Sequence, residues 1–201
     1  MASVPEATPQ QRLLRYNNGA VWLHWLTALV VIAQVVVGFT FANMERGPAR
    51  GDLFTVHKTL GATILLLALI RLGWRLSHPP PPFPTELPKW ERIASVWTHR
   101  AFYVLLIILP LTGLIAVSGG ASAEGKATTP LLGGIPLPLI PGISEDAGET
   151  MGGLHELLVF VTLAILALHV AAATKHQIQH NRAAGRMPPF KAPHEHPTPS
   201  P

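Results

Sequence analysis

Four segments of the chain are long and apolar enough to cross a lipid bilayer, and this feature constrains the fold more than any other. About 30 Å of hydrocarbon requires roughly 20 apolar residues in a helix. The segments cover approximately residues 20–42, 56–76, 95–117 and 153–175. Charged residues make up only 13% of the chain, against about 25% in soluble domains. Because hydrocarbon offers the backbone no hydrogen-bond partner, such spans form helices. The sequence predicts an all-α integral membrane protein built as a four-helix bundle.

The segments that flank the spans indicate how the chain is organised. The spans and their connectors form one domain over residues 19–182, after an N-terminal tail at 1–18. A proline-rich tail at 183–201 is predicted to be disordered. The first span is longer than the apolar region of a signal peptide and lacks a small-residue cleavage site, so we expect it to be retained. The chain has no cysteine, which excludes disulfides, thiolate metal sites and covalent haem attachment.

Lysine and arginine residues are divided unequally between the two sides of the predicted bundle. One side carries eleven of them and the other carries four. The larger set is Arg12, Arg15, Arg71, Arg75, Lys89, Arg92, Arg100, Lys175, Arg182, Arg186 and Lys191, and the smaller set is Arg46, Arg50, Lys58 and Lys126. Since cytoplasmic loops are enriched in Lys and Arg, both termini are predicted to be cytoplasmic, and loops 43–55 and 118–152 to face outward. The basic charge is split among three segments without a recognition motif, so nucleic-acid binding is not indicated.

Histidines lie inside the apolar segments, where a polar side chain is costly and therefore indicates a functional site. His155 and His169 are 14 residues apart on the fourth segment. In a helix this separation corresponds to about 21 Å of rise and about 40° of rotation. The two side chains therefore face the same neighbours at two depths. His24 on the first segment is predicted at the depth of His169, and His57 on the second at the depth of His155.

Two histidine pairs stacked across a four-helix bundle suit two six-coordinate b-type haems. His24 and His169 would hold the inner haem iron, and His57 and His155 the outer one. A zinc site needs three or four ligands, which a bare pair does not supply. Two other interpretations stay open. Single histidines could make hydrogen bonds between helices, or a transporter could use them for protons or metal.

Three further polar residues are predicted near these pairs. Arg71 follows His57 by 14 residues, so helical rise brings it to the inner pair, where it could bind a haem propionate or polarise a quinone carbonyl. His99 opens the third span and could donate a proton at a quinol site. Lys58 could attract a small anion to the outer pair. The alternative for each is an ordinary side chain at the membrane interface.

Short motifs follow one another in a set order along the chain. They are "HW" in the first span, "HKTLG" opening the second, "IRLGWRL" before a proline run, "HRAFYVLLIILPLTG" in the third, and "HE" with "LHVAAATKH" in the fourth. This order and spacing, with Pro110 inside the third span, resembles the bacterial cytochrome b561 family. The resemblance extends over residues 15–182.

The resemblance implies a multi-pass cytochrome of the bacterial inner membrane with two b-type haems that exchanges electrons with ubiquinone. Carried onto this sequence, the haem ligands would be His24 with His169 and His57 with His155. Some members of the family are similar to superoxide:ubiquinone oxidoreductases, so a periplasmic one-electron donor, superoxide included, is expected. The alternative is a cytochrome b subunit that anchors a partner dehydrogenase or periplasmic cytochrome and passes its electrons. Whether the protein is an enzyme or a pure carrier, and whether it oligomerises, stays open.

Overall fold

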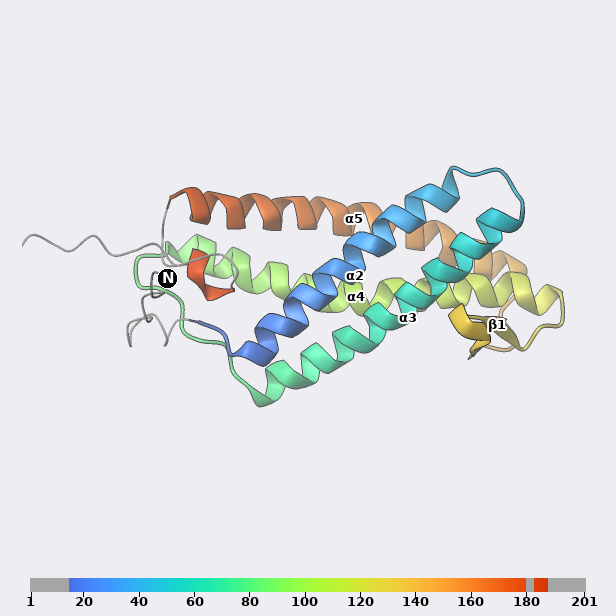
Figure 1. Cartoon of the computed structure of the whole chain (residues 1–201), viewed down its shortest axis with the longest axis horizontal. Coiled ribbons are helices and arrows are strands. Elements are labelled where there is room, and N and C mark those ends of the chain that lie inside the picture. The colour runs from blue at the N-terminus through green and yellow to red at the C-terminus, as the bar shows by residue number, and fades with distance from the viewer. Residues whose placement is uncertain (1–14, 180–182, 188–201) are drawn as a thin grey trace, which may run out of the picture.

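The computed structural model describes residues 15–179 and 183–187 as a bundle of long helices (Figure 1). The long helices are α2 (Asn18–Ala42), α3 (Pro48–Ser77), α4 (Lys89–Ala123) and α5 (Glu145–Ile178). Two short strands, β1 (Thr128–Pro130) and β2 (Pro136–Pro138), flank the 3-10 turn η1 (Leu132–Gly134), and a second turn, η2 (Ala184–Arg186), follows α5. All four long helices are long and apolar enough to span a membrane, with mean hydropathy from 1.8 to 2.4. This architecture confirms the predicted all-α, four-helix membrane bundle.

Three of the helices begin well before the apolar segments that predicted them. Helix α3 begins at Pro48 rather than near residue 56, α4 at Lys89 rather than 95, and α5 at Glu145 rather than 153. Helix start signals explain the difference, because Pro48 opens α3 at a position that suits proline. The Ser144 side chain accepts a hydrogen bond from the Ala147 N–H at the start of α5. Hydropathy marks where a helix enters hydrocarbon, whereas caps mark where it begins.

The bundle consists of two helix pairs, α2 with α3 and α4 with α5, joined where α3 packs against α4. In Figure 1 the α2–α3 pair crosses the α4–α5 pair at an angle. Helices α4 and α5 approach each other closely at Gly119 and Gly148. A Cβ atom on Gly119 would lie 2.6 Å from the Cα atom of Gly148, and a Cβ on Gly148 would lie 2.8 Å from that of Gly119. Only glycine allows the two backbones to meet this closely.

Large apolar side chains cover the outside of the helices, while several hydroxyl groups lie inside. Leu29 and Leu66 are among the exposed leucines, as expected for surfaces that face lipid. Thr27, Ser118 and Thr162 are buried. Each of these three hydroxyls donates to a backbone carbonyl one turn earlier in its own helix, which satisfies it without water.

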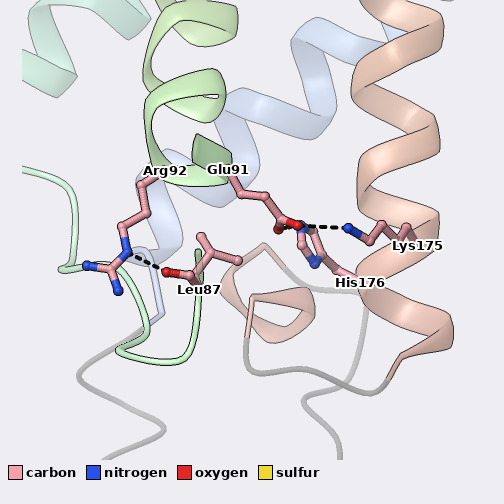
Figure 2. Close-up of polar contacts among 5 residues, drawn as sticks. All are labelled: Leu87, Glu91, Arg92, Lys175 and His176. Carbon is pink, nitrogen blue, oxygen red and sulfur yellow. Dashed lines mark hydrogen bonds and ion pairs between the residues drawn. The ribbon is translucent and has the colours of Figure 1, made fainter. Parts of the chain in front are cut away.

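One carboxylate joins α4 to α5 at the end of the bundle where α2 begins (Figures 1 and 2). Glu91 Oε1 accepts a hydrogen bond from Lys175 Nζ at 2.7 Å, and Glu91 Oε2 lies 3.4 Å from His176 Nε2. The Lys175 ammonium also lies 5.5 Å from the centre of the Trp90 ring. Next to it, Arg92 Nε donates to the Leu87 carbonyl at 2.7 Å, which fixes the connector before α4. A single acidic side chain thus engages two groups on the facing helix.

Glu91→Gln is expected to lower the free energy of unfolding by about 1 kcal/mol, because a charge-assisted hydrogen bond to a partly exposed lysine becomes a neutral one. Thermal unfolding of the purified protein in detergent, followed by circular dichroism, measures the change. Glu156→Gln is the control, since Glu156 is exposed on α5 and should unfold like the wild type. Equal melting of Glu91→Gln and wild type would show that this contact adds no stability.

Residues 183–187, which follow α5, pack against the bundle. Arg186 is buried, its Nη2 donates to the Pro81 carbonyl at 2.6 Å, and its guanidinium lies over the rings of Tyr16 and Phe83 at 5.4 and 4.8 Å. Burial lowers the pKa of Arg186, and Tyr16 opposes that change. The sequence predicts disorder from residue 183 onward, whereas the structure describes residues 183–187 with the Arg186 cation packed on two aromatic rings. The remainder of that tail and residues 1–14 lie outside the described residues.

Candidate functional site

The two histidines predicted for the inner site lie next to each other across the bundle. His24 projects from α2 and His169 from α5, with ring centroids 6.4 Å apart and ring planes inclined by 62°. Both rings are half-buried. Phe102 and His99 of α4 each place a ring 5.5 Å from His169. Three helices thus contribute rings to one level of the bundle.

The two histidines predicted for the outer site form a second pair with nearly the same geometry. His57 projects from α3 and His155 from α5, with ring centroids 6.2 Å apart and planes inclined by 78°. The Phe41 ring of α2 lies 5.0 Å from His57. Helix α5 therefore supplies one histidine to each pair, while α2 and α3 supply one each.

The separations within the pairs fit an iron atom between two axial imidazoles. A bond from imidazole nitrogen to a metal is about 2 Å long, and the ring centre lies about 1 Å beyond the nitrogen, so two imidazoles on one metal have ring centres roughly 6 Å apart. The observed 6.4 and 6.2 Å match this value. Within the described chain, no group of three or more His, Cys, Asp or Glu side chains is placed to hold a metal ion. The donor sets are therefore pairs, which suits haem rather than a protein-only zinc site.

Hydrogen bonding at the outer pair also suits metal ligation. His155 Nδ1 lies 2.9 Å from the Leu109 carbonyl, which can only accept, so Nδ1 carries the proton and Nε2 keeps its lone pair. Ligating histidines are commonly held by such a bond from the other ring nitrogen. His57 Nδ1 is buried and has no hydrogen-bond partner among the described residues. Its Nε2 lies 3.3 Å from the Gln34 amide nitrogen. An unsatisfied buried ring nitrogen indicates that a further group completes this site.

Two glycines give the outer imidazoles room against neighbouring helices. A Cβ on Gly38 of α2 would lie 3.3 Å from His57 Cε1, and a Cβ on Gly113 of α4 would lie 3.2 Å from His155 Cε1. Each helix thus presents bare backbone to a ring. The pair is held by the shape of these helix surfaces as well as by hydrogen bonds.

Gly113→Val is expected to displace the His155 ring and to reduce binding at the outer pair while leaving the inner pair unchanged, because the added methyl groups need the space the imidazole occupies. Haem content by pyridine haemochrome and reduced-minus-oxidised difference spectra measure the effect. Gly153→Val is the matched control, since nothing lies within 4 Å of a Cβ on Gly153. Unchanged spectra of Gly113→Val would show that His155 does not need this space.

The structure brings Arg71 and His99 to the inner pair, as helical spacing predicts for Arg71. Arg71 Nη2 lies 3.4 Å from His24 Nδ1, and the guanidinium lies 5.9 Å from the centre of the Tyr103 ring. His99 Nδ1 donates to the Ser95 carbonyl at 2.7 Å, which leaves Nε2 as its free basic atom. A small pocket lies beside them. It is lined by residues of α2, α3 and α4 and of the segments that flank these helices and α5. Its polar lining is Tyr16, Arg71, Arg75, His78, His99 and Tyr103.

Lys58 lies next to His57 in sequence but is engaged by the loop after α4. Its ammonium hydrogen-bonds to Thr129 of β1 and lies 5.1 Å from the centre of the Phe54 ring. The charge therefore lies beneath the β hairpin rather than in open solvent.

Sequence reasoning missed several residues that shape the two levels. Gln34 contacts His57, Tyr103 contacts Arg71, and Gly38 and Gly113 border the outer rings. A usable signal existed for three of them. A glutamine inside an apolar span is costly, and a glycine inside a helix gives up stability that a close contact must offset. No comparable signal marks Tyr103, because tyrosine is common near membrane interfaces.

Four membrane-spanning helices that pair histidines at two levels define a membrane protein of the cytochrome b type. The family model described as prokaryotic cytochrome b561 matches residues 15–189. The chain therefore belongs to the prokaryotic cytochrome b561 family, which confirms the resemblance found in its motifs. Family membership supports electron transfer by a transmembrane cytochrome and implies b-type haem.

Two curated relatives extend along most of the chain. It is 25% identical over 170 residues to cytochrome b561 homolog 2 of Escherichia coli strain K12, covering 81% of this chain and 84% of that protein. It is 27% identical over 184 residues to the probable superoxide oxidase CybB of Yersinia pestis, covering 88% of this chain and 97% of that protein. Each match is longer than either helix pair alone.

Proposed function

We propose that this protein moves electrons across the membrane through two b-type haems, between a one-electron donor at the outer histidine pair and ubiquinone in the bilayer. Superoxide is the proposed donor, because the relative from Yersinia pestis is a probable superoxide oxidase. Both termini would be cytoplasmic in a bacterial inner membrane, as the distribution of Lys and Arg predicts.

The observation that carries the proposal is the repetition of one geometry at two depths. Each level has two imidazoles whose centres lie 6.4 or 6.2 Å apart. The two histidines of α5 are separated by 14 residues, which corresponds to about 21 Å along the helix axis. Two sites at this spacing occupy most of the roughly 30 Å hydrocarbon thickness. Bound b-type haem would supply reversible one-electron redox chemistry at each level.

The side chains at each level have distinct proposed roles. His24 with His169 and His57 with His155 would hold the cofactors, and the Leu109 carbonyl keeps the proton on His155 Nδ1. Arg71 is placed to pair with a propionate or a quinone carbonyl, since a guanidinium binds planar oxygen groups through two parallel donors. His99 can accept a proton at Nε2 and release it again at a quinone site. Lys58 is the proposed local attraction for an anion at the outer pair.

The overall reaction balances as two superoxide ions oxidised to two molecules of oxygen while one quinone takes up two electrons and two protons. It is tested in proteoliposomes that contain the protein and a short-chain ubiquinone, with superoxide generated outside. We expect superoxide-dependent quinol formation that is lost in His155→Ala and retained in His176→Ala. Arg71→Gln should slow quinol formation while leaving reduction of the outer site by superoxide intact.

A different result would favour the alternative function. If the wild-type protein binds haem but superoxide forms no quinol, the proposed donor is wrong. Co-purification of a dehydrogenase or periplasmic cytochrome that reduces the haems would then indicate a membrane-anchor subunit. Absence of a Soret band in the purified protein would contradict both functions.

A further inference from the structure

The loop between α4 and α5 differs in composition from the other segment at the same end of the bundle. Residues 127–144 read "ATTPLLGGIPLPLIPGIS" and contain no charged side chain. In contrast, the turn between α2 and α3 contains Glu45 and Arg46, and the first turn of α5 contains Glu145 and Asp146. A loop surrounded by water is usually polar. This composition therefore needs a physical explanation.

The hairpin is attached to the bundle at the depth where the helices enter hydrocarbon. The Leu132 N–H donates to Thr59 Oγ1 at 3.0 Å, and the Ile140 N–H donates to Ser118 Oγ at 3.0 Å. Thr59 lies inside the apolar stretch of α3, and Ser118 lies directly after that of α4. In Figure 1 the hairpin, labelled by β1, lies beside the ends of these helices, far from the start of α2. It is held against the spans and does not project away from them.

Several backbone N–H groups of the hairpin are hydrogen-bonded within the protein, which lowers the cost of placing it in a lipid environment. The Leu131 N–H donates to the Ile135 carbonyl at 2.8 Å, Gly134 to the Leu131 carbonyl at 3.1 Å, and Leu139 to the Ala127 carbonyl at 3.0 Å. β1 pairs with β2 in antiparallel register. The segment also contains Pro130, Pro136, Pro138 and Pro141, which have no N–H to satisfy.

The tip of the hairpin exposes apolar side chains, whereas one of the two threonines of β1 is buried and the other, Thr128, is exposed. Thr129 is only 9% exposed, while Leu132 and Ile135 are 49% and 61% exposed. A water-facing hairpin shows the reverse arrangement. On α3, Leu66 is 58% exposed and lies seven residues, or about two helical turns, after the Thr59 that anchors the hairpin. The lipid-facing surface of the spans thus extends onto the hairpin.

We propose that this hairpin is a membrane-interface element whose tip, Leu132 and Ile135, inserts among the lipid headgroups and upper acyl chains beside α3. Three observations support lipid as the partner. They are attachment at the depth of the apolar spans, a backbone without exposed donors at its anchor points, and continuity with the lipid-facing surface. A site for a protein partner would not need all three of these features at once. The insertion fixes the hairpin over the outer histidine pair, since Lys58 and Thr59 follow His57 directly.

The absence of cysteine from the chain makes single-cysteine labelling a clean test. Leu132→Cys and Ile135→Cys are labelled with a nitroxide and reconstituted in nanodiscs with one chain per disc. Electron paramagnetic resonance then compares collisions with oxygen, which concentrates in lipid, and with a water-soluble nickel chelate. Leu66→Cys is the lipid reference, and Glu149→Cys, exposed on α5, is the water reference. Circular dichroism of each variant verifies that the bundle has folded.

The expected result is a several-fold higher ratio of oxygen to nickel accessibility at positions 132 and 135 than at 149, approaching the ratio at 66. Ile135→Cys carries the test alone if Leu132→Cys fails to fold, because Ile135 is the more exposed of the two. A ratio like that of position 149 would overturn the proposal. The hairpin would then lie in water, and its apolar tip would be open to a protein partner. Low accessibility to both reagents would also overturn it, because the tip would then be buried in protein.

Discussion

The purified wild-type protein is expected to contain about two b-type haems per chain, and His155→Ala and His169→Ala are expected to lose one each. Removal of one imidazole leaves a single ligand at that level, and it opens a cavity where the ring was. The two losses should differ in the reduced-minus-oxidised spectrum, because the surroundings of the two levels differ. The outer level contains Gln34 and Phe41, whereas the inner level contains Arg71. Pyridine haemochrome assays give the stoichiometry.

His176→Ala serves as the control for these two variants. His176 lies on the same helix as both ligands but contacts Glu91 at the end of the bundle. It should therefore retain two haems. A single haem that survives both His155→Ala and His169→Ala, or the same spectral loss in both variants, would contradict the two-level assignment. Helical content by circular dichroism separates haem loss from loss of the fold.

Gly119→Ala is expected to cost about 1–3 kcal/mol of stability, because the new methyl group overpacks a contact that cannot relax. A Cβ there would lie 2.6 Å from the Cα of Gly148 and 2.8 Å from the Ser144 carbonyl oxygen. Both obstacles are backbone atoms, so α4 and α5 would have to separate. Separation at this point would also displace His155, two turns further along α5. Thermal unfolding and haem retention at the outer level should therefore fall together.

Gly120→Ala is the matched control for this prediction. It is the next residue on α4, and nothing lies within 4 Å of a Cβ at that position. Alanine is the better helix former, so this variant should be as stable as the wild type or slightly more stable. If Gly119→Ala and Gly120→Ala unfold at the same temperature, close backbone contact is not what joins α4 to α5.

Much of the architecture could be predicted from sequence because the bilayer leaves few choices. Hydrocarbon forces an apolar segment of this length into a helix, and helical rise then fixes the depth of each histidine. Depth alone predicted that His24 would meet His169 and that His57 would meet His155. The structure places both pairs together. The lateral direction of each side chain was constrained only on α5, by the 14-residue spacing of its histidines.

The features that sequence did not predict depend on contacts between distant segments. Arg186 is ordered because Tyr16, Pro81 and Phe83 converge on it from two other segments. Proline-rich composition favours disorder only when no such partner exists. The hairpin at residues 128–138 could not be predicted for a similar reason. Its strands of three residues are too short to form alone, and α3 supplies the hydroxyl that holds the turn.

Helix α5 carries one histidine of each pair, whereas α2 and α3 carry one partner each. A helix moves as a rigid rod, so any rotation or axial shift of α5 changes both ring separations in the same step. Helix α2 also contacts His57 through Gln34 and Phe41, and α3 contacts His24 through Arg71. The two levels are thus mechanically coupled, most directly through α5. A substitution that displaces α5 as a whole should affect both levels at once, even at a position that contacts neither histidine.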